Sequence, residues 1–454
     1  MAQSEIGKAG ANPTKAFFVR MITRDISLED CILDLIDNSV DGAWRCEGSR
    51  PMGLALGADL SQYEIKITAK PDKFCIEDNC GGMTFEDAVN HAFSFGRPEK
   101  ADTDDFSIGI YGIGMKRAVF KLGADITVRS TFTKPEGDRA SFAVPIVVSE
   151  WLKDDVPPWD FKIVSDTELE QDGVQINIKS LTSSTEASFG SLAFLQSLKR
   201  TISRDYSLHL HRGLRIVLND VPIVGWQIEM LESDVFAPMR VSYRDDFEGS
   251  PVDVEIIGGM AAPPPDTSDP DIEDDGEKRY GWYIVCNGRI VLAADKSSVS
   301  GWGTDDWPQW HRQYSGFIGI ILFTAANAAA LPLTTTKRSV DSTSEVYRRA
   351  RPKMRELTRA WINYTNQRKQ SLDEAKSMEA IARPVAIHSL SARPAAVFSY
   401  VTPRPTEKVA NVNYSVKLQR MKNLAKALGS PNLKYRDVGL QAFDYMYDDI
   451  VGKD

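Results

Sequence analysis

The chain has 454 residues, which is enough for two or three domains. Hydrophobic residues make up 42% of it and charged residues 26%, as is typical of soluble globular proteins. The formal net charge of −9 excludes a global basic field that would recruit nucleic acid, and leaves open only a local basic patch.

A helix is predicted from about Ser27 to Arg45, after a polar arm over residues 1–25. Ser27 is a good N-cap, and Asp30 takes the place of the capping-box glutamate three residues later. Four apolar residues recur at helical spacing and are expected to face the core: Ile32, Leu35, Ile36 and Val40.

Alternating apolar and polar residues predict five short strands, over 63–69, 73–78, 124–132, 140–148 and 173–181. Residues 83–95 are expected to form a short helix and 96–105 a polar loop. We therefore expect residues 1–184 to form one α+β domain.

A second α+β domain is expected over 185–340, with a helix at 191–206 and further strands at 214–223, 252–259, 281–294 and 316–325. Residues 262–278 are acidic and rich in proline, which predicts a disordered surface loop. Residues 341–454 are expected to be mainly helical. Pro352 either kinks the first of these helices or opens its main part.

The segment LDLIDNSVDGA carries the first candidate chemistry. Asp34, Asn38 and Asp41 are spaced at i, i+4 and i+7, so a helix places them on one face. The amide oxygen of Asn38 is a hard ligand suited to Mg²⁺, and Asp34 can orient and deprotonate a water for attack on a γ-phosphate. Taken alone, the segment fits an ordinary amphipathic helix with solvated acids equally well.

The segment IEDNCGGM places Asp78 at the end of a predicted strand. A carboxylate there can accept a hydrogen bond from an exocyclic amine, which would select adenine over guanine. Gly81 and Gly82 would let the backbone approach a flat ring. The alternative is a plain β-turn with an aspartate at its start.

The segment SIGIYGIGMKRA has glycines at 109, 112 and 114, followed by Lys116. Backbone N–H groups of such a loop can converge on phosphates, and the start of the following helix adds a favourable dipole. A flexible glycine loop is the alternative. The chain has no GxxxxGK[ST] sequence, so it is not a P-loop protein.

In this order, the three segments resemble the GHKL ATPase superfamily. Its motifs E-x-x-x-N-x-x-D-A, D-x-G-x-G-M and G-x-x-G-x-G-x-K stand here as DLIDNSVDGA, DNCGGM and GIYGIGMK. The superfamily includes gyrase-type topoisomerases, the large heat-shock chaperones, histidine kinases, MutL and MORC proteins. The resemblance implies an α+β fold, with a two-layer α/β sandwich of the Bergerat type, then a transducer-like domain and a helical C-terminal appendage.

The resemblance also implies ATP and Mg²⁺ as ligands, with a lid over about residues 93–115. Asp34 would be the catalytic base and Asn38 the metal ligand. The positions matched to nucleotide contacts are Asn38, Asp41, Asp78, Gly82, Met83, Gly109, Tyr111, Gly112, Ile113, Gly114, Met115 and Lys116.

In several GHKL members a lysine from the second domain reaches the γ-phosphate. The segment LPLTTTKRSVD offers Lys337 for this catalytic and binding role, and a plain surface lysine is the alternative.

The sequence departs from the GHKL motifs at three positions. Asp34 replaces the usual glutamate, Cys80 replaces a turn glycine, and Val174 replaces the threonine of a G-T-x-I motif.

The closest group is the MORC-like ATPases, because we find no phospho-acceptor histidine ahead of the ATPase segment and no room for a topoisomerase or client-binding domain. We expect a nucleotide-gated switch that forms a homodimer on ATP binding and has a protein partner. A DNA-linked or defence role would follow by analogy only. The rival hypotheses are a non-hydrolysing ATP-binding scaffold and a nucleic-acid clamp that uses the basic helix 348–359.

The remaining features predict little chemistry. The five cysteines lack zinc-type spacing, which favours reduced thiols in a cytoplasmic protein. No apolar run approaches ~18 residues, so no membrane span is expected. His209 and His211 are expected to alternate on a strand and to face solvent or a neighbour rather than a metal.

Overall fold

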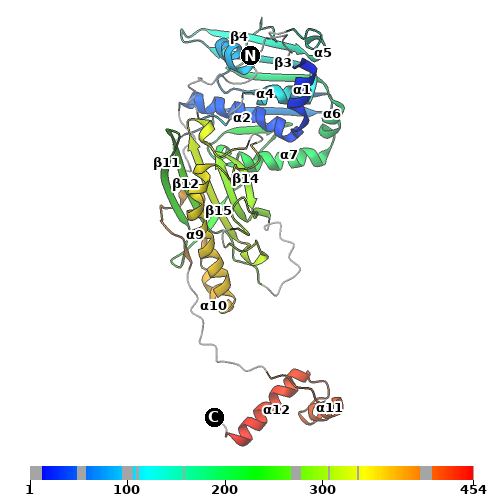
Figure 1. Cartoon of the computed structure of the whole chain (residues 1–454), viewed down its shortest axis with the longest axis vertical. Helices are drawn as coiled ribbons and strands as arrows, with labels where there is room; N and C mark the ends of the chain where they lie inside the picture. Colours follow the sequence, from blue (N-terminus) through cyan, green and yellow to red (C-terminus); the bar gives the residue numbers. More distant parts are fainter. Residues whose placement is uncertain are drawn as a thin grey trace, which may run out of the picture. The chain divides into compact units, whose positions relative to one another are not determined.

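The computed structural model describes residues 13–48, 58–94, 106–108, 112–156, 159–266, 278–304, 307–334, 337–398 and 412–452. It divides into two compact units, Met1–Thr402 and Pro403–Asp454, which are described separately (Figure 1). The polar loop expected at 96–105 and most of the acidic loop expected at 262–278 lie outside the described residues.

The predicted N-terminal helix is confirmed as α2 (Leu28–Glu47), which follows α1 (Lys15–Arg24). The Ser27 hydroxyl accepts a hydrogen bond from the backbone N–H of Asp30 at 3.0 Å, as a cap does. Gly48 ends the helix with a φ of +64°, and its N–H donates to the carbonyl of Arg45. Local sequence signals therefore set both ends of α2.

An eight-stranded mixed sheet has the strand order β5-β4-β3-β6-β2-β1-β7-β8. Its strands are β1 (Glu64–Lys70), β2 (Lys73–Asp78), β3 (Gly123–Thr133), β4 (Arg139–Val147), β5 (Val164–Ser165), β6 (Gly173–Leu181), β7 (Arg215–Leu218) and β8 (Val221–Pro222). Because β7 pairs with β1 in parallel, the sheet runs past residue 184, the predicted end of the first domain.

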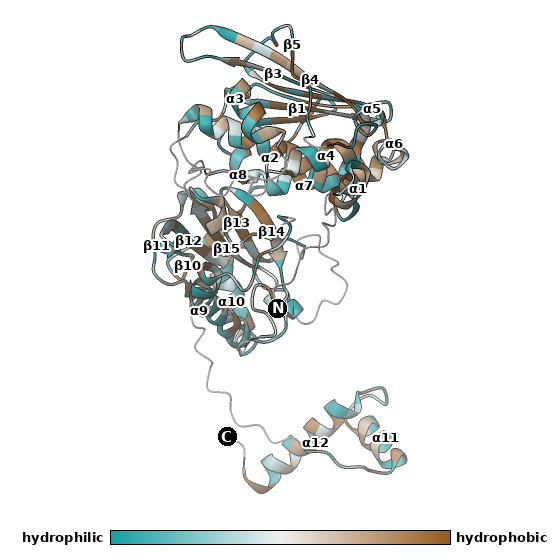
Figure 2. Ribbon diagram, turned by 45° about the horizontal axis from the view of Figure 1, so that its top comes forward, coloured by the Kyte–Doolittle hydropathy of each residue, from teal (hydrophilic) through white to brown (hydrophobic). Residues whose placement is uncertain are grey.

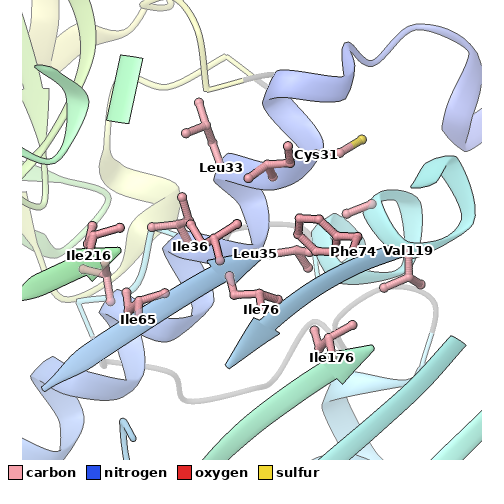
Figure 3. Packing of buried hydrophobic residues seen from close by; sticks show 14 of the residues in the cluster. Cys31, Leu33, Leu35, Ile36, Ile65, Phe74, Ile76, Val119, Ile176 and Ile216 are labelled. Atoms are coloured by element: carbon pink, nitrogen blue, oxygen red, sulfur yellow. The ribbon is translucent and has the colours of Figure 1, made fainter. Parts of the chain in front are cut away.

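Helices cover one face of this sheet (Figure 1). They are α2, α4 (Gly114–Leu122), α6 (Ser183–Phe189), α7 (Leu192–Asp205) and α8 (Ser207–Leu210). In Figure 3, Leu35 and Ile36 of α2 pack against Ile65 of β1 and Ile76 of β2. Strand β1 buries alternate residues and leaves those between them partly or fully exposed, as expected for a sheet covered on one side.

A second, five-stranded sheet has the order β11-β12-β15-β13-β14. Its strands are β11 (Met239–Phe247), β12 (Ser250–Met260), β13 (Gly281–Cys286), β14 (Arg289–Asp295) and β15 (Phe317–Ala325). Every residue of β13 and β15 is buried, and Figure 2 shows these strands in hydrophobic colours. Helix α9 (Glu345–Arg368), which contains Pro352, packs on one face of this sheet, while α7 and α8 contact β14.

The short elements complete the larger unit. They are α3 (Phe85–Asp87), the π-helical turn η1 (Ala88–Ala92), α5 (Val148–Trp151), α10 (Leu372–Glu379), β9 (Glu229–Glu232), β10 (Phe236–Ala237), β16 (Arg383–Ala386), β17 (Val397–Phe398), and the 3₁₀ turns η3 (Arg312–Tyr314), η4 (Ala328–Ala330) and η5 (Ile387–Ser389). The described part of the second unit contains α11 (Leu418–Ala427) and α12 (Tyr435–Ile450).

Candidate functional site

The helix α2 carries the predicted acidic residues and one more. Asp34 is almost fully buried and Asp41 is partly buried, whereas Asn38 lies on the exposed side of the helix. Asp37, which is not among the predicted site residues, has no exposed surface. The structure shows no hydrogen bond between the Asn38 side chain and another described residue, so its amide oxygen is free to act as a ligand.

Both carboxylate oxygens of Asp34 are paired with cations. Oδ2 accepts from Arg117 of α4, with Nε at 2.8 Å and Nη2 at 2.6 Å. Oδ1 lies 3.2 Å from Nζ of Lys337. A Cβ added at Gly114 would lie 3.3 Å from Cγ of Asp34, so the glycine at the start of α4 permits this close approach. In this structure, cations therefore contact both oxygens of the Asp34 carboxylate.

Asp37 is the centre of a buried cluster that joins α2 to the second sheet. Its Oδ2 accepts from Nη1 of Arg289 on β14 and from Nζ of Lys337 at 3.0 Å. Its Oδ1 accepts from the Tyr206 hydroxyl at 2.7 Å. Burial alone would raise the pKa of Asp37, but the charges of Arg289 and Lys337 overcome it and hold that pKa below its ordinary value. Asp37 is therefore a buried carboxylate in its charged form.

Lys337, predicted to reach a γ-phosphate, lies beside the acids of α2 in this structure. Burial lowers its pKa, but Asp37 and Asp34 outweigh this and raise it, which keeps the ammonium charged. Its φ of +56° is uncommon for a lysine, so its surroundings hold the backbone in place. The next residue, Arg338, extends the contact with the first domain and binds Glu29, Asp30 and Asp205.

Asp78 is held at the end of β2 by three hydrogen bonds. Oδ2 accepts from the Ser39 hydroxyl at 2.6 Å, while Oδ1 accepts from the backbone N–H groups of Cys80 at 3.0 Å and Val174 at 3.3 Å. Burial raises the pKa of Asp78. A backbone N–H of Val174, the residue in place of the threonine of the G-T-x-I motif, thus contacts this carboxylate.

The turn after Asp78 packs closely against β3. Gly82 has a φ of +73°, and a Cβ added there would lie 2.0 Å from the carbonyl oxygen of Thr131, so only glycine fits. The backbone N–H of Met83 donates to Oγ of Ser130 at 2.7 Å, and this hydroxyl donates to the Met83 carbonyl at 2.9 Å. These contacts fix the turn whether or not it faces a nucleotide.

Only part of the glycine-rich loop can be described, because Gly109 and Tyr111 lie outside the described residues. Gly112 has a φ of +63°, which favours glycine. Ile113 is the N-cap residue of α4, and Gly114 and Met115 form its first turn.

Lys116, expected to meet phosphates, is buried in this structure. Its Nζ donates to the backbone carbonyls of Ala92 at 2.8 Å and Ser94 at 2.5 Å. These carbonyls lie at the end of η1, at the predicted start of the lid. Lys116 therefore ties α4 to that end of the lid.

Asp41 contacts another described part of the predicted lid, residues 106–108. Both of its oxygens accept from the backbone N–H of Ile108, each at 3.1 Å. Burial, followed by the charge of Asp37, raises the pKa of Asp41 to about 7. The charge of this carboxylate, which contacts the backbone of Ile108, therefore changes near neutral pH.

The second sheet also contacts residues 106–108. Nδ2 of Asn287, in the β13–β14 turn, donates to the carbonyls of Phe106 at 2.9 Å and Ser107 at 3.1 Å. The N–H of Phe106 donates to the carbonyl of Ala326 at 3.1 Å. Residues 106–108 thus lie between the acids of α2 and the second sheet.

The strand expected around His209 and His211 is wrong, because His209 lies in the helix α8 with no exposed surface. Nδ1 accepts from Nε1 of Trp44 at 3.2 Å, and Nε2 has no partner among the described residues. A Cβ added at Gly288 would lie 2.5 Å from the ring, so the histidine packs against the β13–β14 turn. Burial, aided by the charge of Arg212, lowers the pKa of His209 to about 3.

This burial predicts a loss of stability in mild acid. Between pH 6.5 and about 3, the unfolded chain binds a proton at His209 that the folded chain does not, so stability falls as the pH falls. We expect the His209 contribution to drop by about 1 kcal/mol from pH 6.5 to 5.5. Urea unfolding at both pH values checks this. If the free energy of unfolding differs between the two pH values by the same amount in His209→Gln as in the wild type, the prediction is contradicted.

The basic side chains of α9 are partly neutralised within the fold. Arg349 pairs with Asp245 at 2.7 Å and with Glu345 at 2.6 Å, and Nζ of Lys353 lies 5.7 Å from the ring centroid of Tyr243. Arg349 therefore has acidic partners within the protein, and Lys353 lies against an aromatic ring. These two contacts do not favour nucleic acid as the ligand of 348–359.

The large mixed sheet with helices on one face is consistent with a GHKL ATPase fold. Residues 26–172 match the family described as histidine kinase-, DNA gyrase B-, and HSP90-like ATPase. This match supports the GHKL superfamily, and with it ATP binding, for the segment that contains all three motifs. Lys337 lies outside the matched range. No curated protein matches the chain. No helix in the described residues is long and apolar enough to cross a membrane.

The candidate ligand Asn38 is compatible with Mg²⁺, which needs few protein ligands. Among the described residues, no group of three or more histidine, cysteine, aspartate or glutamate side chains could hold a metal ion. Mg²⁺ commonly takes one or two protein oxygens and completes its shell with water and substrate phosphate. The exposed amide oxygen of Asn38, one turn after Asp34, fits that pattern.

Proposed function

We propose that the chain is a Mg²⁺-dependent ATPase of the MORC-like group that acts as a nucleotide-gated switch. The observation that supports this most is the position of Lys337. It follows the second sheet in the sequence, yet its ammonium lies buried against Asp34 and Asp37 of the matched ATPase domain. A side chain of a second domain that contacts the γ-phosphate must extend into the first domain, as Lys337 does.

Each matched residue has a role in the proposed site. Asp78 would accept a hydrogen bond from the adenine amine, with Gly82 and Met83 beside the ring. The loop residues 109–115 and Lys116 would bind phosphates through backbone N–H groups and a positive charge. Asn38 would contribute the protein ligand of Mg²⁺, which supplies charge neutralisation for the phosphates, and Asp41 would hold the lid.

The ion pairs of Asp34 suggest how hydrolysis is gated. A γ-phosphate offers Lys337 a strong anionic partner that competes with both carboxylates. When Lys337 moves to the phosphate, Oδ1 of Asp34 is released and can accept a proton from the attacking water. Loss of the γ-phosphate after hydrolysis returns Lys337 to α2 and resets the contact between the domains.

One observation favours the alternative of a non-hydrolysing ATP-binding scaffold. Arg117 holds Oδ2 of Asp34 with two nitrogen atoms, and the aspartate is one methylene shorter than the usual glutamate. A base displaced by ~1 Å can lose ~100-fold in rate. In this alternative, ATP would fix the arrangement of the domains without being consumed.

Titration with ATP in the presence and absence of Mg²⁺ tests the proposed site. We expect Asn38→Ala to weaken ATP binding about tenfold with Mg²⁺ and much less with EDTA, because the amide oxygen acts through the ion. Asn423→Ala, on the exposed surface of α11, is the matched control. Equal loss of affinity with and without Mg²⁺ would show that Asn38 is not a metal ligand.

The wider setting belongs to the same proposal. We propose a cytoplasmic protein that forms a homodimer on ATP binding and acts on a protein partner, with a DNA-linked or defence role by analogy to MORC-like proteins. Light scattering with and without a slowly hydrolysed ATP analogue tests whether the nucleotide changes the number of copies in the complex.

A further inference from the structure

Each of the two large sheets contains a two-residue hairpin turn that begins with an asparagine. Asn219 follows β7, which pairs in parallel with β1, and Asn287 follows β13, which pairs in parallel with β15. Their φ angles are +48° and +45°. Asparagine tolerates this conformation better than most residues, and the turn type requires it. The backbone of the turn therefore accounts for an asparagine at both positions.

Both asparagine side chains also bind the neighbouring parallel strand in the same way. Oδ1 of Asn219 accepts from the N–H of Ala69 at 2.8 Å, and its Nδ2 donates to the Ala69 carbonyl at 3.0 Å. Oδ1 of Asn287 accepts from the N–H of Ala325 at 3.0 Å, and its Nδ2 donates to the Ala325 carbonyl at 3.0 Å. This shared pair of bonds is a structural role, because it continues the pairing of each strand.

Asn287 makes two further hydrogen bonds, which the turn itself does not need. Its Nδ2 also donates to the carbonyls of Phe106 at 2.9 Å and Ser107 at 3.1 Å. These residues lie 181 and 180 positions earlier in the chain, in the predicted lid. Among the described residues, the Asn219 side chain has no bond of this additional kind. The comparison separates a contact with the lid from the structural role that the two asparagines share.

The segment that Asn287 binds is held on two sides. Phe106 has a φ of +57°, which is uncommon for a phenylalanine and needs surrounding contacts to hold it. Its N–H donates to the carbonyl of Ala326 beside the second sheet. Ile108 is 1% exposed, and its N–H donates to Asp41 of α2. Because Gly109 comes next in the chain, the position of this segment sets where the glycine-rich loop begins.

We propose that Asn287 is a positioning residue for the phosphates of ATP, which acts by holding residues 106–108 at the start of the glycine-rich loop. The inference rests on the nucleotide site of the proposed function. Arg289, two residues later in the same turn, binds Asp37 of α2. One turn of the second sheet thus contacts both the lid and the acids of α2. A movement of that sheet reaches the phosphate site through Asn287 as well as through Lys337.

Hydrogen exchange without nucleotide tests the contact with the lid. Glycine adopts positive φ readily, so Asn287→Gly and Asn219→Gly both keep the turn and both lose the bonds to the neighbouring strand. Asn287→Gly also loses the two bonds to the lid. We expect the peptide that spans 106–108 to exchange at least about tenfold faster in Asn287→Gly, and at the wild-type rate in Asn219→Gly. Equal exchange in the two variants would overturn the proposal.

A second variant covers the case in which Asn287→Gly does not fold. Asn287→Asp keeps an oxygen for the N–H of Ala325 and lacks the N–H donors for Phe106 and Ser107. We expect it to show the same faster exchange of the 106–108 peptide. A wild-type rate in this variant would overturn the proposal.

Titration with ATP and with adenosine tests the effect on phosphates. We expect Asn287→Gly to weaken ATP binding about tenfold and adenosine binding less than twofold, because adenosine has no phosphate for the glycine-rich loop. Asn219→Gly should bind both ligands like the wild type. Unchanged ATP affinity in Asn287→Gly, or an equal loss for both ligands, would overturn the positioning role. A wild type that binds neither ligand would overturn the proposed function, whereas the exchange rates would still decide whether Asn287 holds the lid.

Discussion

Replacing Arg289 with leucine is expected to lower the free energy of unfolding by about 3 kcal/mol. Arg289 and Asp37 are both fully buried, and Arg289 keeps its charge because the attraction of Asp37 outweighs the penalty of burial, which raises its pKa. Without the guanidinium, the Asp37 carboxylate is left in the interior with Lys337 as its remaining cation. Chemical denaturation of the wild type and the variant measures the loss.

The controls for this prediction separate the buried pair from a general effect of removing an arginine. Arg349→Leu removes surface ion pairs from a side chain that is half exposed, and we expect it to cost no more than about 1 kcal/mol. Adding Asp37→Asn to Arg289→Leu should recover part of the loss, because the unpaired charge is then removed. An Arg289 variant as stable as the Arg349 variant would contradict the prediction.

The parts of this fold that depend on near neighbours were predictable from the sequence. Ser27 and Asp30 mark the start of α2, and the spacing of Leu35 and Ile36 assigns its buried face. The strands β1 and β2 follow from their alternation and from the turn between them. In each case the determining contacts lie within a few residues, so the local pattern contains the information.

The role of Asp37 could not be predicted in the same way. Its partners Arg289 and Lys337 lie 252 and 300 residues away in the chain. In the sequence, Asp37 is one more acid on a helix that already has several. The available signal was its position between Ile36 and Val40 on the apolar side of α2, where an acid needs a buried partner.

The other differences between the predicted and the observed fold lie in short elements or in contacts between segments far apart in the chain. The alternation in SLHLHR has the period of a strand, but the segment continues directly from α7, and its burial under the β13–β14 turn favours a helical turn at His209. The pairing of β7 with β1 joins segments about 150 residues apart, so no local pattern could show that the sheet extends beyond residue 184. The long-range arrangement determines these features.

The largest effect on activity is expected at Asp34. Asp34→Asn should reduce phosphate release from ATP by at least about 100-fold, because the amide cannot take the proton of the attacking water. The amide oxygen can still accept from Arg117, and Lys337 keeps its contact with Asp37, so ATP affinity should change only a few-fold. Steady-state phosphate release and ATP titration on the same preparations measure the two effects.

The glutamate variant separates a misplaced base from an absent one. If the shorter side chain limits hydrolysis, Asp34→Glu should raise the rate of phosphate release, since the extra methylene restores the reach of the usual GHKL residue. Glu47→Gln, at the end of the same helix, should leave the rate unchanged. Tight ATP binding without phosphate release in the wild type and in both Asp34 variants would favour the scaffold alternative, in which the cations around Asp34 hold two domains together rather than regulate a base.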